Sequence, residues 1–214
     1  MENIIDAAIA YVKEIFKNDF SGHDYFHTMR VYNLAVTIAK SENADMEIVS
    51  LSALLHDIDD AKLSPDTYKD KGNAVSFMKS HNLPKDKIDK ICAILNEISF
   101  AGTDSVTPES IEGKCVQDAD RLDAIGAIGI ARAFAYGGNR NRQMYNPDIK
   151  PLENMNNESY IKNENATTIN HFYEKLLLLK NMMNTNTAIK IAQKRNDFMK
   201  AYLDEFFAEW NSER

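Results

Sequence analysis

The stretch LSALLHDIDD, from Leu51 to Asp60, indicates the fold more clearly than other parts of this sequence. Its apolar positions continue those on either side, so that Ile48, Leu51, Leu55 and Ile58 fall on one helical face. The apolar run then ends in a histidine and three aspartates. Two interpretations are open: this is a solvated helix end, or a buried helix carries metal ligands at its terminus.

The same helical periodicity continues through most of the chain. No segment alternates polar and apolar residues for long enough to be a convincing strand, and only 8 Gly and 5 Pro interrupt 214 residues. The sequence therefore predicts an all-α fold, a compact multi-helix bundle. Helices are expected around residues 5–16, 27–38, 48–58, 74–78, 84–98, 116–136 and 189–210.

Domain organisation follows from the absence of any linker between two apolar regions. We expect one domain over residues 1–214, with a helical C-terminal region from about residue 158. Residues 137–157 form the one long irregular segment, and loops of this length are usually functional lids or disordered.

Composition bounds the function. The hydrophobic fraction of 44% can build a sizeable core, while the net charge of −7 argues against binding a nucleic-acid polymer. Cys92 and Cys115 lack the spacing of a zinc site and are expected to be reduced thiols. The N-terminal segment has no signal-peptide pattern, and no stretch is apolar enough for a membrane span. We expect a cytoplasmic protein without a membrane partner.

Three separated pieces of sequence carry groups that can bind a metal. His27 shares a helical face with apolar residues, His56 and Asp57 end an apolar helix, and DADRLDA begins at Asp118. Each piece also has a simpler explanation. His27 could be a hydrogen-bonded core histidine, and the His56-Asp57 dipeptide could occur by chance. The acids of DADRLDA could be favoured by the dipole at a helix start. The joint occurrence of the three pieces in one helical chain favours a site for a divalent transition metal, because buried imidazoles and carboxylates are costly unless paired or coordinated.

These pieces, in HDYFHTMRV, ALLHDIDDAK and DADRLDA, resemble the H…HD…D pattern of the HD-domain metal-dependent phosphohydrolases. The resemblance covers most of the chain and is closest to stand-alone bacterial hydrolases of about this length. It implies a helical core that holds one divalent ion between His27, His56, Asp57 and Asp120. Asp118 is the alternative fourth ligand, and it projects about 200° from Asp120 on a helix.

The resemblance also bears on the number and type of metal ions. Some family members bind further ions through additional histidines, and His81 stands where one often occurs. The next expected histidine is replaced by Asn96 and Glu97, which favours a single ion and makes His81 a helix-end residue. Manganese, nickel, iron or cobalt suits two imidazoles better than magnesium does. A di-iron oxygenase would need more histidine ligands than the five in this chain readily supply.

The family resemblance assigns catalytic and substrate-binding candidates as well. Asp60 is the expected proton-transfer residue and Asp59 its alternative, although Asp59 is equally well explained as a solvated loop acid. Arg121 resembles the basic residue that contacts phosphate in the family, since a guanidinium suits phosphate oxygens. Three further cations, for which a plain surface role is the simpler explanation, are Lys62, Arg140 and Arg142.

The predicted function is a metal-dependent phosphohydrolase acting on a nucleotide or a related small phosphate ester. Such an enzyme would be a nucleoside triphosphate pyrophosphohydrolase or a phosphatase. The alternative is a non-catalytic HD module that serves as a nucleotide or metal sensor or as an interaction domain. The intact ligand set together with Asp60 favours the enzyme.

Overall fold

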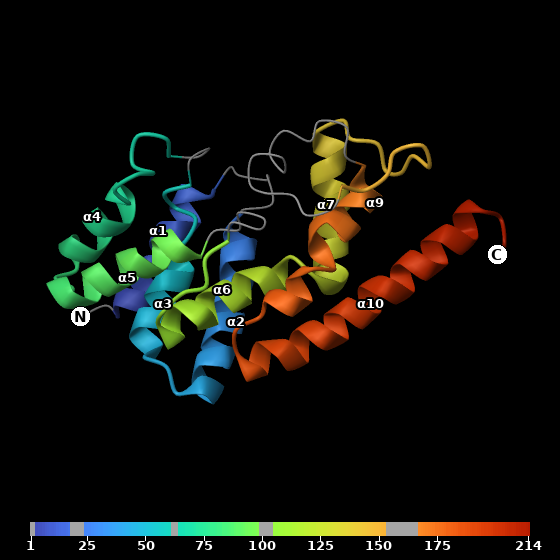
Figure 1. Ribbon diagram of the computed structural model, residues 1–214. Coiled ribbons are helices and arrows are strands. Elements are labelled where there is room, and N and C mark those ends of the chain that lie inside the picture. Colours follow the sequence, from blue (N-terminus) through green and yellow to red (C-terminus); the bar gives the residue numbers. More distant parts are fainter. Residues whose placement is uncertain (1–2, 18–23, 61–63, 99–104, 153–166) are drawn as a thin grey trace. The chain divides into compact units, whose positions relative to one another are not determined.

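A computed structural model describes residues 3–17, 24–60, 64–98, 105–152 and 167–214 (Figure 1). The regular structure in these residues is helical and contains no strand, which confirms the all-α prediction. Among the same residues, no helix combines the length and the apolar character that crossing a membrane requires. Two compact units make up the chain: Met1–Phe100 with Val106–Asp120, and Ala101–Ser105 with Arg121–Arg214. The expectation of one domain stays a prediction.

The N-terminal unit is built around a helix, α3 (Met46–Leu55), that is buried along most of its length. Its helices are α1 (Ile4–Ile15), α2 (Tyr25–Glu42), α3 (Met46–Leu55), α4 (Gly72–Ser80), α5 (Lys85–Glu97) and most of α6 (Ile111–Asp123). Every residue of α3 from Ile48 to Leu55 is buried, and α3 packs against α1, α2 and α5 (Figure 1). This central position explains why its sequence is apolar on nearly all sides.

Side-chain caps determine where the first three helices begin. The side chains of Asn3, Asp24 and Asp45 each accept a hydrogen bond from a backbone N–H of the first turn. Such caps satisfy donors that a helix start leaves unpaired, and each contributes on the order of 1 kcal/mol.

The prediction of one long helix over residues 116–136 is wrong, because two helices separated by a turn occupy this stretch. Helix α6 ends at Asp123, and α7 (Gly126–Asn139) begins after a turn. Gly126 has a φ of 78°, and a Cβ there would lie 3.0 Å from the Cγ of Arg195. Apolar periodicity continues on both sides of the break, so the pattern did not reveal it. DADRLDA therefore lies at the end of α6 rather than at a helix start, and the dipole there disfavours acids.

The C-terminal unit contains α7 together with a helical segment of changing pitch. That segment comprises α9 (Thr168–His171), η1 (Phe172–Leu176) and η2 (Leu179–Met182), and α10 (Asn186–Trp210) follows it. Helix α7 packs against α9 and α10. The expected irregular segment starts later than residue 137, since α7 continues to Asn139. The expected start of the C-terminal helical region, near residue 158, lies outside the described residues.

Candidate metal centre

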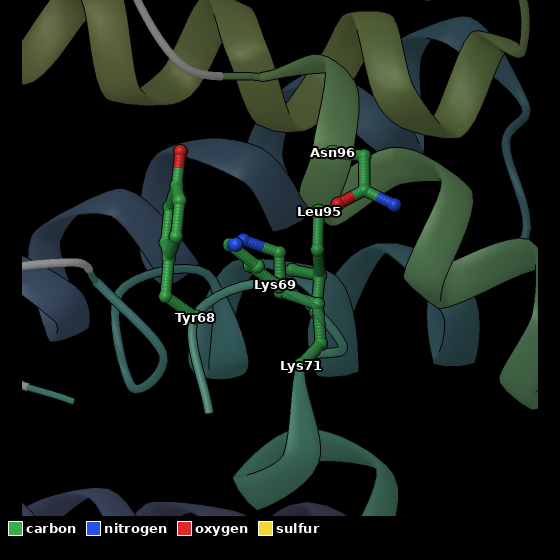
Figure 2. Close-up of a pocket in the computed structure, with 5 residues that line it drawn as sticks. All are labelled: Tyr68, Lys69, Lys71, Leu95 and Asn96. Carbon is green, nitrogen blue, oxygen red and sulfur yellow. The ribbon is translucent and has the colours of Figure 1, made fainter. Parts of the chain in front are cut away.

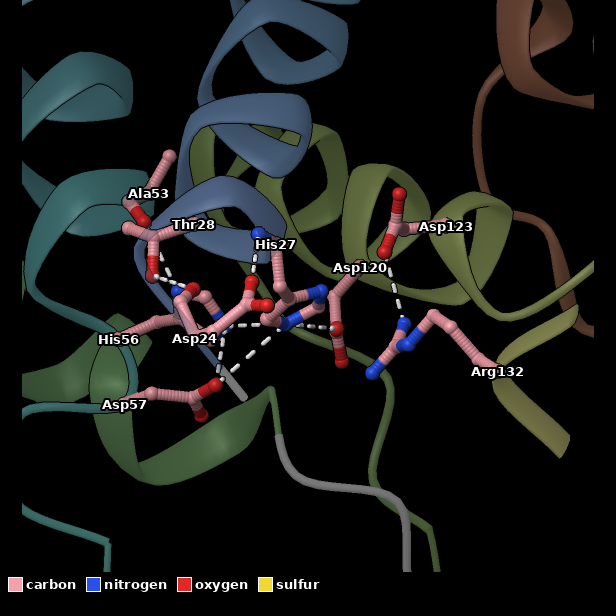
Figure 3. Close-up of polar contacts among 9 residues, drawn as sticks. All are labelled: Asp24, His27, Thr28, Ala53, His56, Asp57, Asp120, Asp123 and Arg132. Atoms are coloured by element: carbon pink, nitrogen blue, oxygen red, sulfur yellow. Dashed lines mark hydrogen bonds and ion pairs between the residues drawn. The ribbon is translucent and has the colours of Figure 1, made fainter. Parts of the chain in front are cut away.

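Four predicted metal ligands converge in the N-terminal unit (Figure 3). His27 comes from the first turn of α2, His56 and Asp57 follow α3, and Asp120 lies near the end of α6. The Nε2 atom of His27 lies 3.3 Å from Nε2 of His56, 3.4 Å from Oδ2 of Asp57 and 3.5 Å from Oδ1 of Asp120. Nε2 of His56 is 3.1 Å from the same Asp57 oxygen.

These separations are those expected of ligands that share one ion. Two donors that each lie about 2.1 Å from a metal are about 3.0–3.4 Å apart at octahedral or tetrahedral angles. His27, His56 and Asp57 offer ligand atoms that all lie within 4.8 Å of one another. The donor set of imidazole and carboxylate fits a divalent transition ion.

His27 is oriented by the cap of its own helix. Its imidazole is fully buried, and its backbone N–H donates to Oδ1 of Asp24 at 2.7 Å. Asp24 thereby fixes the start of α2, and with it the direction of the His27 side chain. An aspartate three residues before the histidine is a helix-start pattern that can be read in the sequence.

His56 is held by its other ring nitrogen. Nδ1 lies 2.8 Å from the carbonyl oxygen of Ala53, so a proton on Nδ1 can be donated there. That tautomer leaves the Nε2 lone pair directed at the cluster, which is how imidazole ligands are usually oriented.

The protonation of His56 reports the charge of the cluster. Burial lowers the pKa of His56, but the charge of Asp57, its hydrogen bond and the charge of Asp120 together raise this pKa to about 9. The carboxylates therefore favour a positive charge at this point. A proton on His56 supplies that charge in the metal-free protein, and a metal ion would supply it in the loaded protein.

The two aspartates differ in accessibility from the histidines. The side chains of Asp57 and Asp120 are 14% and 31% exposed, whereas those of His27 and His56 are 0% and 4% exposed. The cluster is thus closed on the imidazole side and open on the carboxylate side. Asp118 is fully buried on another face of α6, so the contact between Asp120 and His27 favours Asp120 as the fourth ligand.

Asp59 and Asp60 have different environments. Asp59 is 1% exposed, and its carboxylate accepts the backbone N–H groups of Asn73 and Ala74 at 3.1 and 2.9 Å. It caps α4 from a distance, so its interpretation as a solvated loop acid is wrong. Asp60 is partly exposed and its N–H donates to the carbonyl of Asp57 at 3.0 Å. Its catalytic role stays a prediction.

The basic candidates do not share one location. Arg121 is 5% exposed, and its guanidinium donates to the carbonyl of Met182 in the C-terminal unit. Arg140 and Arg142 both lie against the ring of Tyr136, at 5.6 and 5.9 Å from its centroid. Lys62 falls outside the described residues. Substrate binding by these four cations stays a prediction.

The remaining residues singled out in the sequence have structural surroundings. His81 follows the end of α4, and its ring packs 4.4 Å from that of Phe77, which agrees with a helix-end residue. Asn96 and Glu97 form the end of α5. Cys92 and Cys115 are both free thiols, as expected.

Comparison with known proteins identifies the family of this arrangement. Residues 24–125 match the HD domain. The chain is 40% identical over 192 residues to YpgQ of Bacillus subtilis strain 168, covering 88% of this chain and 85% of YpgQ. The chain belongs to the HD domain family. This confirms the predicted family, and the HD domain match spans the three helices that bring the His and Asp residues together.

Solved structures of similar proteins have the same fold over nearly their whole length. A Lactobacillus plantarum protein superimposes with a TM-score of 0.87 and 38% identity, covering 99% of this chain and 98% of that one. An HD-superfamily hydrolase from Bacillus thuringiensis superimposes with a TM-score of 0.77 and 38% identity, covering 97% of this chain and 96% of that one. YpgQ from Bacillus subtilis in complex with ADP superimposes with a TM-score of 0.76 and 37% identity, covering 96% of this chain and 97% of that one.

Proposed function

We propose that this HD domain protein is a metal-dependent phosphohydrolase that acts on a nucleotide or a related small phosphate ester. The observation that carries the proposal is the convergence of His27, His56, Asp57 and Asp120 at ligand-to-ligand distances of 3.1–3.5 Å. Support for hydrolysis comes from the relative in Bacillus thuringiensis, an HD-superfamily hydrolase.

We assign one divalent transition ion to the site, namely manganese, nickel, iron or cobalt, with magnesium less suited. Two imidazoles and two carboxylates favour these ions, whereas magnesium prefers oxygen ligands alone. When bound, such an ion polarises a phosphoryl oxygen and lowers the pKa of water, which makes a nucleophile available near neutral pH.

The protein residues then have separate tasks. The buried histidines and their partners Asp24 and Ala53 keep the ligand atoms in place before substrate arrives. The exposed side of Asp57 and Asp120 leaves room for a phosphate to approach. Asp60, three residues beyond Asp57, is our candidate for accepting a proton from water or returning one to the leaving oxygen.

A nucleotide is the favoured substrate class because the relative YpgQ was crystallised with ADP. Hydrolysis could release phosphate, as a phosphatase does, or pyrophosphate, as a nucleoside triphosphate pyrophosphohydrolase does. These two activities differ in the bond that breaks, so the product distinguishes them.

The test is turnover that depends on an added metal. The protein is stripped of metal, single metals are added back, and nucleoside mono-, di- and triphosphates are assayed with phosphate and pyrophosphate resolved. Asp57→Asn removes a ligand, while Asp86→Asn changes the same charge on an exposed turn of α5 and serves as the control.

Activation by manganese or a similar ion, lost in Asp57→Asn and kept in Asp86→Asn, is expected. Tight metal binding without turnover of any nucleotide would instead favour the non-catalytic sensor. Failure to bind metal would overturn the assignment of the site.

A further inference from the structure

A polar pocket lies in the N-terminal unit, and none of the four predicted metal ligands lines it (Figure 2). Its volume is about 310 Å³. We call it the lysine pocket, and its lining residues are Tyr68, Lys69, Lys71, Leu95 and Asn96. Lys71 immediately precedes α4, and Leu95 and Asn96 belong to the last turn of α5.

Lys71 is a buried residue with a cationic side chain, and no carboxylate of the described residues pairs with it. It is only 8% exposed, and neither it nor Lys69 forms an ion pair with a residue that the structure describes. Its Nζ lies 4.8 Å from the centroid of the Tyr68 ring, and Figure 2 shows both lysine side chains pointing toward that ring. A buried ammonium group is costly without a counter-charge, so this arrangement favours an anionic ligand.

Both walls of the lysine pocket are connected to carboxylates of the metal centre. On one side, Asp59 is two residues beyond Asp57, and its carboxylate holds the N–H groups of Asn73 and Ala74, which closely follow Lys71. The position of Lys71 is therefore coupled to the turn that carries Asp57.

The opposite wall is connected through α6. The Nε2 group of Gln117 donates to the carbonyl of Glu97 at 3.0 Å, and Glu97 directly follows Asn96. Gln117 lies one helical turn before Asp120. The pocket and the metal centre are thus held together through short, hydrogen-bonded connections within one unit.

We propose that the lysine pocket binds a phosphate group of the substrate other than the one that reacts at the metal centre. This proposal rests on the function proposed above and narrows its substrate class to compounds with at least two phosphate groups. The ammonium of Lys71 would face the anion from the interior, while Lys69 and the Asn96 amide donate from the exposed rim. A pocket of about 310 Å³ is at the small end of ligand sites, which suits a phosphate chain.

Charge-removing variants test the proposal. Lys71 has a left-handed backbone with a φ of 55°, a conformation that asparagine tolerates, so Lys71→Asn removes the ammonium group without adding backbone strain. Lys69→Gln removes the exposed charge. Lys90→Gln removes an exposed lysine charge on α5, outside the pocket lining, and is the matched control.

Two readouts are needed. Calorimetry measures binding of inorganic pyrophosphate to the metal-free protein in the presence of a chelator, and steady-state kinetics measures KM for a nucleoside triphosphate. We expect Lys71→Asn and Lys69→Gln to weaken pyrophosphate binding at least tenfold and to raise KM for the triphosphate similarly. The Lys90→Gln control should change both values less than threefold.

The outcomes separate this proposal from the proposed function. Wild-type turnover with unchanged pyrophosphate binding and KM in both pocket variants would overturn the lysine pocket alone, as would wild-type protein that binds no pyrophosphate. Pyrophosphate binding that depends on the lysines, in a protein that hydrolyses no nucleotide, would overturn the function and keep the anion site. If Lys71→Asn lowers the melting temperature sharply, the exposed Lys69→Gln variant decides.

Discussion

Each unit of this protein contains a buried histidine, and the pKa values of these two histidines are shifted in opposite directions. In the N-terminal unit, burial lowers the pKa of His56, but Asp57 and Asp120 raise it to about 9. In the C-terminal unit, burial lowers the pKa of His171, and Lys175 and Arg142 lower it further, to about 3. Burial acts in the same direction on both, so the sign of the neighbouring charges decides which histidine becomes a cation.

The comparison shows what makes a site for a metal ion. The N-terminal unit gathers carboxylates around its imidazoles and so attracts positive charge. In the C-terminal unit, charged groups have partners within the unit: the buried Asp123 pairs with Arg132 at 2.7 Å, and Arg195 donates to the carbonyl of Leu122. A buried histidine is therefore informative about function only together with the charges that surround it.

The largest expected effect comes from Asp57→Asn, which removes a negative charge beside His56, whereas the charges of Lys175 and Arg142 beside His171 are positive. Replacing even a partner of a metal ligand typically costs 10–100-fold, so Asp57→Asn should lower metal-dependent turnover by more than about 100-fold. The same variant should lower the pKa of His56, measured by NMR titration of the metal-free protein. An unchanged His56 pKa would contradict our account of the cluster.

The pH dependence of metal binding should also differ from that of an ordinary histidine site. Metal binding needs neutral His56, whose pKa in the metal-free protein is about 9, so each bound ion must displace a proton. Apparent affinity should therefore rise about tenfold per pH unit up to about pH 9. Competition with a metal indicator between pH 6.5 and 9 would check this, and a plateau near pH 7 would contradict it.

Asp59 and Asp60 offer a comparison within one turn of chain. Asp59→Ala removes the acceptor for two backbone N–H groups of α4 and should lower the free energy of unfolding by about 1–2 kcal/mol. Asp60→Ala should leave stability nearly unchanged and lower turnover by roughly 10²–10⁴-fold if Asp60 transfers the proton. Denaturant unfolding and kinetics on both variants check this. Loss of turnover without loss of stability in Asp59→Ala, or the reverse in Asp60→Ala, would contradict the assignment.

The smallest expected effect concerns His171. Below about pH 6.5 the unfolded chain takes up a proton that folded His171, with its pKa of about 3, does not bind. Stability is thus fully present above pH 6.5 and falls as the pH drops toward 3. Relative to wild type, His171→Gln should gain about 1 kcal/mol between pH 7 and 5.5, measured by urea unfolding. A constant difference between the two proteins would rule out the lowered pKa.

Local pattern accounts for much of the fold and for the ligand types. The spacing of His27 with the apolar face of its helix predicted its burial, because side-chain direction along a helix repeats every 3.6 residues. A helix over residues 48–58 was predicted on the same basis, and α3 does run through this stretch, although it ends earlier, at Leu55. The capping role of Asp24 was also readable, since it depends on a separation of three residues.

Contacts between distant residues decided the rest. The break between α6 and α7 depends on the positive φ of Gly126 and its close approach to Arg195. The choice of Asp120 over Asp118 depends on which face of α6 meets His27.

The sequence by itself determined an all-helical chain that presents imidazoles and carboxylates at helix ends, because helical periodicity and residue chemistry are local properties. Only the tertiary structure decided that Asp59 caps α4 across 15 positions of the chain, and that Lys71 is buried without a carboxylate partner among the described residues. Burial and long-range hydrogen bonds depend on which segments pack together, and no local pattern encodes that.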